Sequence, residues 1–186
     1  MMDAFVFLAL GIVLGILVVL VRRRFAEFPG QTPDDYSEGF PGFDLKTHLN
    51  GQMVCEGVIF GPMGRVTSSF VADFDISWAG DNGVMSERFR YNDGSVQDRE
   101  WRIALGTDGA FTVRADDVPG EGHGHLSGSA AQLRYEIILP PESGGHRLQT
   151  VDWMYLTPQG TIVNRSQFRK YGIKVAELIA TIRPKE

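Results

Sequence analysis

The feature that most constrains the fold is a two-residue alternation of apolar and polar side chains, which begins after Gly51. It is clearest over residues 66–78, where one face is largely apolar and the other is mostly polar. The apolar face consists of Val66, Ser68, Phe70, Ala72, Phe74, Ile76 and Trp78. Side chains of a β-strand point alternately to its two faces, so this pattern predicts a strand with one buried face. A strand of this length is typical of a barrel or a strongly coiled sheet.

Further alternating segments follow at intervals of about ten residues, separated by turn signals such as Asn92-Asp93-Gly94 and Asp108-Gly109. The last run, residues 173–183, fits helical spacing as well as strand spacing, and we favour a strand. We therefore expect an all-β antiparallel meander of eight to ten strands over residues 47–186. Closing it into a lipocalin-like barrel would remove the exposed edges of the sheet.

Residues 4–21 form an uninterrupted apolar run, AFVFLALGIVLGILVVLV, without charge or proline. As a helix it would be about 27 Å long, close to the roughly 30 Å hydrocarbon core of a bilayer. The alternative is a cleaved signal peptide, which needs a positively charged start and a cleavage site of small residues. The only charged side chain before the run is that of Asp3, and Arg22-Arg23-Arg24-Phe25 follows the run. We therefore predict an uncleaved transmembrane anchor over residues 1–25, with the lipid bilayer as the partner of residues 4–21.

The cations that flank this run predict its orientation. Three arginines follow it and no Lys or Arg precedes it, so the positive-inside rule places the C-terminal domain in the cytoplasm. The same charges attract anionic lipid by about 1 kcal/mol each. We expect a single-pass protein of the inner (cytoplasmic) membrane with a cytoplasmic C-terminal domain; a periplasmic domain is the open alternative.

Residues 26–46 are expected to link the anchor to the barrel. Pro29, Pro33 and Pro41 lie there among glycines and acidic residues. Because proline lacks a backbone N–H and resists both helix and sheet ladder, this composition predicts an extended tether. Residues 44–49 fit a single helical turn just before the first strand.

Charge and cysteine content exclude several classes of function. The chain has 18 Lys and Arg against 23 Asp and Glu, a formal net charge of −5. Nucleic-acid binding needs clustered cations that neutralise phosphates, so we expect no nucleic-acid partner. The single cysteine, Cys55, cannot form an intrachain disulfide or build a zinc site by itself. We expect it to be a small buried apolar residue.

Several polar residues fall on the inner face that the alternation predicts. Glu87, Arg99, Asp152 and Asn164 each share strand parity with apolar neighbours. An unpaired charge inside a barrel is costly, so these groups must pair with one another or bind something. The alternative to a ligand site is an internal network of Glu–Arg and Asp–Arg pairs, or strand-end residues that face water. The candidate residues for the lining of a ligand site or its polar support are Glu87, Arg99, Trp101, Asp152, Trp153, Asn164 and Arg165.

The histidines suggest a metal site only weakly. His123 and His125 lie at a spacing that lets two imidazoles share a metal, with Glu121, Asp116 or Asp117 as a third donor. A lone His-x-His pair is common in glycine-rich turns, so we expect no metal, and we expect no cofactor. The sequence contains no GxxxxGK[ST] phosphate loop, no GxGxxG and no GxSxG elbow.

Six ordered segments also carry a family resemblance: EGVIFGPMGRV (56–66), SERFRYNDG (86–94), REWRI (99–103), ADDVPGEGHG (115–124), VDWMYL (151–156) and NRSQFRKYGIKVAEL (164–178). Over about residues 40–183 the chain resembles the uncharacterised bacterial family called domain of unknown function 3833. The family has no established activity, so the resemblance supplies no catalytic residues. Its members are usually lipoproteins, and some are encoded beside fatty-acid-modifying enzymes of the cyclopropane synthase type, which implies a role in envelope lipid physiology. This chain lacks a cysteine in or just after the apolar run, so its helix would replace the lipid as anchor.

Three functions follow as hypotheses. The first is a membrane-tethered barrel that binds a fatty acid, a lipid or another apolar small molecule. The second is a non-catalytic accessory or structural protein, with a filled barrel, whose outer face docks a membrane enzyme such as a fatty-acid-modifying enzyme. The third, which we expect less, is an enzyme that acts on lipid with Glu87 or Asp152 as acid or base.

Overall fold

The computed structural model describes residues 2–186 and divides into two compact units, one that ends at Asp35 and one that spans Tyr36–Glu186. The first unit contains the apolar helix and the start of the connection that follows it. The second contains every strand of the molecule that the structure describes. Each unit is described by itself below.

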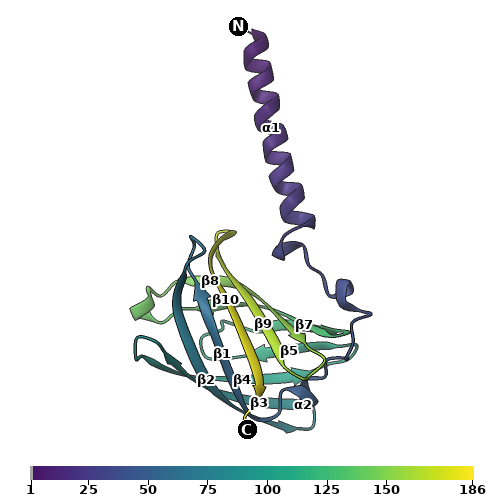
Figure 1. Cartoon of the computed structure of the whole chain (residues 1–186), viewed down its shortest axis with the longest axis vertical. Helices are drawn as coiled ribbons and strands as arrows, with labels where there is room; N and C mark the ends of the chain where they lie inside the picture. The colour runs from purple at the N-terminus through teal and green to yellow at the C-terminus, as the bar shows by residue number, and fades with distance from the viewer. Residues whose placement is uncertain (1) are drawn as a thin grey trace. The chain divides into compact units, whose positions relative to one another are not determined.

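Helix α1 (Met2–Phe25) is the apolar helix that the sequence predicts (Figure 1). Over Ala4–Arg22 its mean hydropathy is 3.2, and none of that stretch is buried within the protein. A helix satisfies its backbone hydrogen bonds internally, which is what a segment in hydrocarbon requires. By length and composition α1 is able to cross a membrane. A signal sequence near the N-terminus has the same properties.

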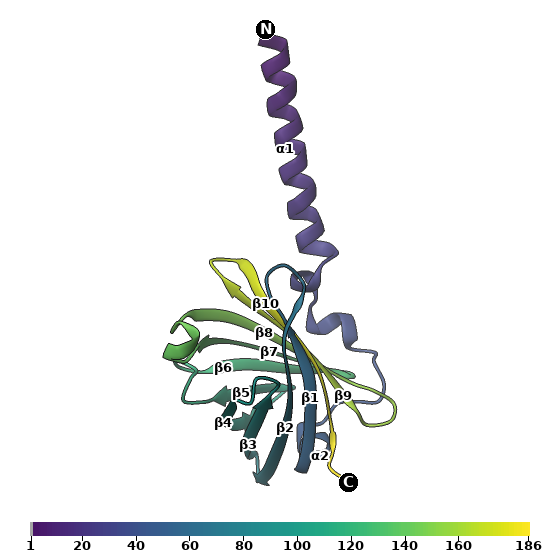
Figure 2. The ribbon, with the colours of Figure 1, turned by 60° about the vertical axis from the view of Figure 1, so that its left-hand side comes forward.

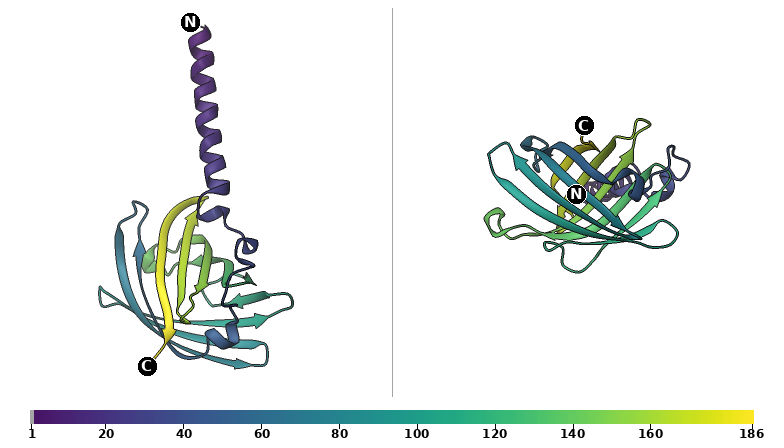
Figure 3. Two further views of the ribbon diagram at one scale, coloured as in Figure 1. Left: turned by 45° about the vertical axis from the view of Figure 1, so that its right-hand side comes forward. Right: turned by 90° about the horizontal axis from the view of Figure 1, so that it is seen from below.

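Ten strands form the second unit. They are β1 (Gly51–Phe60), β2 (Val66–Ala79), β3 (Asn82–Tyr91), β4 (Val96–Leu105), β5 (Ala110–Arg114), β6 (Gly122–Ser127), β7 (Ala130–Ile138), β8 (Arg147–Leu156), β9 (Ile162–Lys170) and β10 (Ile173–Pro184). Each strand pairs antiparallel with the next along the chain, and β1 pairs with β10 to close the sheet. Figures 2 and 3 show the strands curving around one interior. The predicted closed, all-β meander is therefore confirmed, at the upper end of the predicted strand number.

The sequence patterns account for the main features of this barrel. In β2, Phe70, Ala72, Phe74 and Ile76 are all buried, as the alternation predicts. The Asp108-Gly109 turn takes positive φ angles of 55° and 78°, which tight hairpins require and Asp-Gly accommodates. The ambiguous run 173–183 is a strand, because it supplies the partner that β1 needs for closure.

A short helix, α2 (Leu45–His48), covers one end of the barrel (Figure 1). The carboxylate of Asp44 accepts a hydrogen bond from the Thr47 backbone N–H at 2.7 Å and so caps the helix. Leu45 and Leu49 are buried, and the Leu49 carbonyl accepts a 2.8 Å hydrogen bond from the Trp78 indole. The predicted helical turn over residues 44–49 is confirmed, and it closes the barrel at that end.

The structure differs from the extended tether that we expected over residues 26–46. Two 3-10 helices, η1 (Phe28–Gly30) and η2 (Pro33–Tyr36), occupy its first part. From Tyr36 onward the chain packs on the barrel, and Phe43 is buried. Proline and glycine did prevent long regular structure, but aromatic residues between them dock against the strands. The barrel unit therefore begins about ten residues before the expected boundary at residue 47.

Candidate functional site

The barrel encloses a cavity of about 780 Å³. Its wall is mostly apolar, with aromatic and aliphatic side chains from most of the strands, and Leu45 and Leu49 border it at the α2 end. Representative lining residues are Ile59, Phe70, Phe74, Met85, Phe89, Trp101, Leu133, Ile137, Met154, Phe168 and Leu178. A volume of roughly 300–1,000 Å³ with predominantly apolar walls is typical of a small-molecule site.

A cluster of polar side chains, which we call the polar group, lies in the wall of this cavity: Glu87, Arg99, Asp117, Tyr135 and Asp152. Its centre is on the neighbouring strands β3 and β4. Glu87 and Arg99 are directly opposite each other in the ladder, and Glu87 is only 7% exposed. The Arg99 guanidinium lies 4.0 Å from the Trp101 ring centroid and 5.9 Å from that of Tyr135, within range of cation–π attraction. The Trp101 and Tyr135 rings meet edge to face at 5.2 Å, so the guanidinium lies against an adjoining pair of aromatic rings.

Burial dominates the ionisation of Glu87. It raises the pKa of Glu87 to about 7, although the positive charge of Arg99 and a hydrogen bond from Trp101 act in the opposite direction. The Oε2 atom of Glu87 is buried without a hydrogen-bond partner. This carboxyl group is thus poised between its neutral and charged forms near neutral pH.

Asp152 lies on β8 in the same cavity, opposite Ser166 of β9. Burial raises the pKa of Asp152, against hydrogen bonds from Ser166 and Tyr135 that act to lower it. Burial also raises the pKa of Tyr135 well above its ordinary value, so its hydroxyl stays neutral and available as a donor. Asn164 also lines the cavity, and its side-chain amide donates to the Trp153 carbonyl at 3.1 Å.

Asp117 joins this group and completes the barrel wall. Strand β4 pairs with β5 only over Arg102–Leu105, so the rest of its edge needs another cover. The Asp117 carbonyl accepts a hydrogen bond from the Ile138 N–H of β7 at 2.8 Å. Its carboxylate accepts from Nε and Nη2 of Arg99 at 3.1 and 3.0 Å. Asp117 therefore connects β7 to β4 across the region that the short strands leave open.

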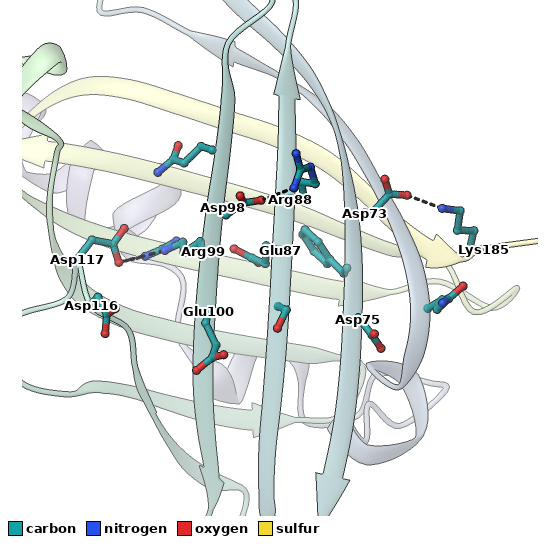
Figure 4. Close-up of a pocket in the computed structure, with 14 residues that line it drawn as sticks. Asp73, Asp75, Glu87, Arg88, Asp98, Arg99, Glu100, Asp116, Asp117 and Lys185 are labelled. Carbon is teal, nitrogen blue, oxygen red and sulfur yellow. Dashed lines mark hydrogen bonds and ion pairs between the residues drawn. The ribbon is translucent and has the colours of Figure 1, made fainter.

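A second hollow, of about 680 Å³, lies beside this part of the wall (Figure 4). Acidic side chains border it, including Asp73, Asp75 and Asp98. Lys185 pairs with Asp73 at 2.7 Å, as the figure shows. Glu87, Arg99 and Asp117 border both this hollow and the interior cavity. The polar group is therefore the part of the wall that separates the two.

Two of the seven predicted site residues lie elsewhere. Trp153 and Arg165 are on the outer face of the barrel, because each occupies the strand position next to an inward-facing residue. Trp153 is 1% exposed since Tyr36 covers it, with ring centroids 5.1 Å apart. Arg165 donates through Nε to Glu177 at 2.7 Å. Both support the barrel from outside and do not line the cavity.

The structure brings the other five predicted residues into the cavity wall: Glu87, Arg99, Trp101, Asp152 and Asn164. Sequence reasoning did not assign Asp117 or Tyr135 to this group. Tyr135 carried a signal, since it shares strand parity with Leu133 and Ile137. Asp117 carried none, because its place depends on how the loop after β5 bridges the wall.

Histidine and cysteine chemistry does not contribute to this site. Among residues 2–186, no group of three or more His, Cys, Asp or Glu side chains is arranged to hold a metal ion. His123 is exposed on β6, away from the cavity lining. Cys55 is buried, as predicted, and burial raises the pKa of its thiol to about 12, so it stays a protonated apolar side chain.

These features define a class of protein: a closed antiparallel β-barrel with a cavity of small-ligand size and a polar group in its wall. The chain belongs to the family described as "Protein of unknown function (DUF3833)", whose model matches residues 24–184. The resemblance found from the sequence is thereby confirmed. No curated protein matches the chain.

A solved structure extends the comparison of folds. The S-type phycobiliprotein lyase CPES from Guillardia theta is similar to this chain with a TM-score of 0.57 and 8% sequence identity. The match covers 75% of this chain and 90% of that one. At this identity the likeness concerns the fold alone, and it confirms the lipocalin-like barrel.

Proposed function

We propose that the barrel binds an apolar small molecule, of the fatty-acyl or lipid class, in its interior. The observation that carries this proposal is the cavity of about 780 Å³ with mostly apolar walls around one polar group. A filled barrel, which an accessory protein without a ligand would have, does not fit a space of this size. An apolar ligand gains about 25 cal/mol for each Å² of its surface that it removes from water.

The polar group supports a role in orienting the ligand. Glu87 Oε2 and Asp152 Oδ1 are both buried without a hydrogen-bond partner. A buried carboxyl oxygen without a partner is costly, on the order of 1–3 kcal/mol. We expect a polar end of the ligand to approach this group, in which Arg99, lying against the Trp101 and Tyr135 rings, is the positive component.

We further propose that α1 anchors the protein in a membrane, with the barrel on the cytoplasmic side. The support for this is an exposed apolar helix followed by three arginines. An anchored carrier would hold its cavity close to the source of its ligand. This placement fits a role in envelope lipid metabolism.

The test is to identify what the full chain carries when it is purified from membranes. Organic extraction followed by mass spectrometry is applied to the unaltered chain and to two variants of β3. Met85→Trp adds bulk inside the cavity, whereas Val84→Trp adds the same side chain on the outer face, where Val84 is 40% exposed. Lipids that surround α1 are common to all three samples and cancel in the comparison.

We expect one class of compound to be present in the unaltered chain and in Val84→Trp but depleted in Met85→Trp. Extracts that are identical for all three chains would refute ligand binding. The docking of a membrane enzyme on the outer face would then be the better explanation.

A further inference from the structure

Two hairpins stand side by side at the end of the barrel opposite α2, as Figures 1 and 2 show. One connects β1 to β2 and the other connects β9 to β10. Their strands pair up to Phe60, which lies opposite Glu177. The cavity reaches this end, since the facing residues Ile59 and Leu178 line it. We call these two hairpins the rim hairpins.

The tips of the rim hairpins carry large apolar side chains that no other part of the barrel covers. Met63 is 83% exposed and Tyr171 is 91% exposed. Beside them, Val66 is 54% exposed and Ile173 is 66% exposed. Single exposed apolar residues are ordinary, but four on adjacent hairpins form a patch of the kind that marks an interaction surface.

The charge of the rim hairpins is opposite to that of the chain as a whole. Residues 61–66 and 168–175 contain four Lys and Arg and no acidic residue, in a chain of net charge −5. Lys174 is paired with Glu177 at 2.6 Å, and the Arg169 guanidinium donates to the Gly172 carbonyl and the Gln167 side chain. Arg65 and Lys170 are the other two positive charges of the patch. The loops after β3 and β5 instead carry acidic residues, including Asp93 and Asp116. Positive charge and apolar tips therefore coincide on one side of the barrel end.

Tyr171 adopts a backbone conformation that is unfavourable for an aromatic residue. Its φ is +52°, in the left-handed region that glycine, asparagine and aspartate adopt more readily than an aromatic residue. Gly172 follows it and completes the turn. Local folding alone would be served better by asparagine, so the tyrosine ring at this tip points to a role outside the barrel.

We propose that the rim hairpins dock on an anionic lipid bilayer: Met63 and Tyr171 enter the headgroup region, and Arg65 and Lys170 contact lipid phosphates. Apolar side chains combined with cations are the two signals that bind a protein surface to such a membrane. A hydrophobic protein partner would not require the positive charge, and a nucleic acid would not require the apolar tips. Docking in this way would open a path between the bilayer and the cavity past Ile59 and Leu178. The proposal stands on the hairpins alone and does not require the cavity ligand.

The test places an environment-sensitive fluorophore at single cysteines of the full chain, reconstituted in lipid nanodiscs that contain nitroxide-labelled lipid. Met63→Cys and Tyr171→Cys report on the rim hairpins, in a Cys55→Ala background. Phe40→Cys is the matched control, because Phe40 is also apolar and 88% exposed but lies beside the β6–β7 hairpin at the opposite end. Arg65→Glu and Lys170→Glu, made in the labelled chains, test the charge.

We expect lipid nitroxides to quench the fluorophore several-fold more at positions 63 and 171 than at position 40. Anionic lipid should increase this quenching, and the charge reversals should reduce it. Equal quenching at all three positions would overturn the proposal, and so would no quenching at 63 and 171. Ligand extraction from the cavity is measured separately, so a failure here leaves that proposal standing.

Discussion

Glu87 and Glu177 have nearly the same solvent exposure, 7% and 8%, and each lies near an arginine on the neighbouring strand. Their pKa values nevertheless shift in opposite directions. Inside the barrel, burial raises the pKa of Glu87 to about 7. On the outer face burial also acts to raise the pKa of Glu177, but hydrogen bonds from Lys174, Arg165 and Gln167 outweigh it and lower the pKa.

Two differences explain the opposite shifts: the Glu87 carboxyl is enclosed far more deeply by the protein than that of Glu177, and Glu177 has more hydrogen-bond donors. Glu177 accepts from Lys174 at 2.6 Å and from Arg165 at 2.7 Å, so its negative charge is fully compensated. Glu87 shares its arginine with Asp117 and keeps one oxygen without a partner. The outer group is therefore a completed ion network that stabilises the sheet. The inner carboxyl group of Glu87 keeps a buried acceptor oxygen, which a polar end of the proposed ligand would satisfy.

The largest expected effect is on stability, and it differs between Trp153 on the outer face and Trp101 in the cavity wall. Trp153→Ala should lower the free energy of unfolding by about 3–5 kcal/mol, because it empties a fully enclosed site under Tyr36. Trp101→Ala should cost less stability, since its ring already borders the cavity. Chemical unfolding of the full chain, followed by circular dichroism, measures both losses. A larger loss for Trp101→Ala would mean that the interior is packed and not hollow.

The second prediction concerns how the ionisation of Glu87 makes the free energy of unfolding depend on pH. The folded chain keeps Glu87 neutral up to a pKa of about 7, whereas the unfolded chain ionises it at about 4.5. Its contribution is therefore fully present below pH 4.5 and is lost as the pH rises through 7, by about 3 kcal/mol in total. Glu87→Gln should remove this dependence and be relatively more stable at pH 8. Parallel pH profiles for the two chains between pH 4.5 and 8 would contradict it.

The third and smallest effect concerns Glu177 on the outer face, whose contribution to stability changes with pH in the opposite direction to that of Glu87. Because the folded pKa of Glu177 is lowered, its stabilisation is present above its unfolded pKa and is lost as the pH falls. Glu177→Gln should cost about 1 kcal/mol at pH 7, a modest value because Arg165 and Lys174 are partly exposed. Thermal unfolding at pH 7 and at pH 3 measures the difference. A stability difference that grows on acidification would refute the assignment.

Periodicity alone predicted most of the fold and part of the site. The alternation placed Glu87, Arg99, Asp152 and Asn164 on the inner face, and the structure finds all four in the cavity wall. It could not place Asp117, because a loop that bridges two strands has no period. It could not predict that Tyr36 covers the outer face, because docking of a proline- and glycine-rich segment depends on tertiary packing.

Trp153 and Arg165 were candidates for the lining of the site or its polar support. Each adjoins an inward-facing residue, and adjacent residues of a strand face opposite sides, so the structure places both on the outer face. Trp153 is buried all the same, which a two-sided barrel with a covered outer face allows. Burial and orientation are therefore separate predictions, and only orientation decides which residues can reach a ligand.

The most direct measurement is photo-crosslinking of the full chain in membranes with a diazirine-bearing alkyl probe, followed by peptide mapping. An occupied barrel predicts crosslinks to inward residues such as Met85, Phe89 and Leu133, and their loss in Met85→Trp. Crosslinks confined to α1 or to the outer residues Trp153 and Tyr155, and unchanged in Met85→Trp, would contradict a ligand in the interior.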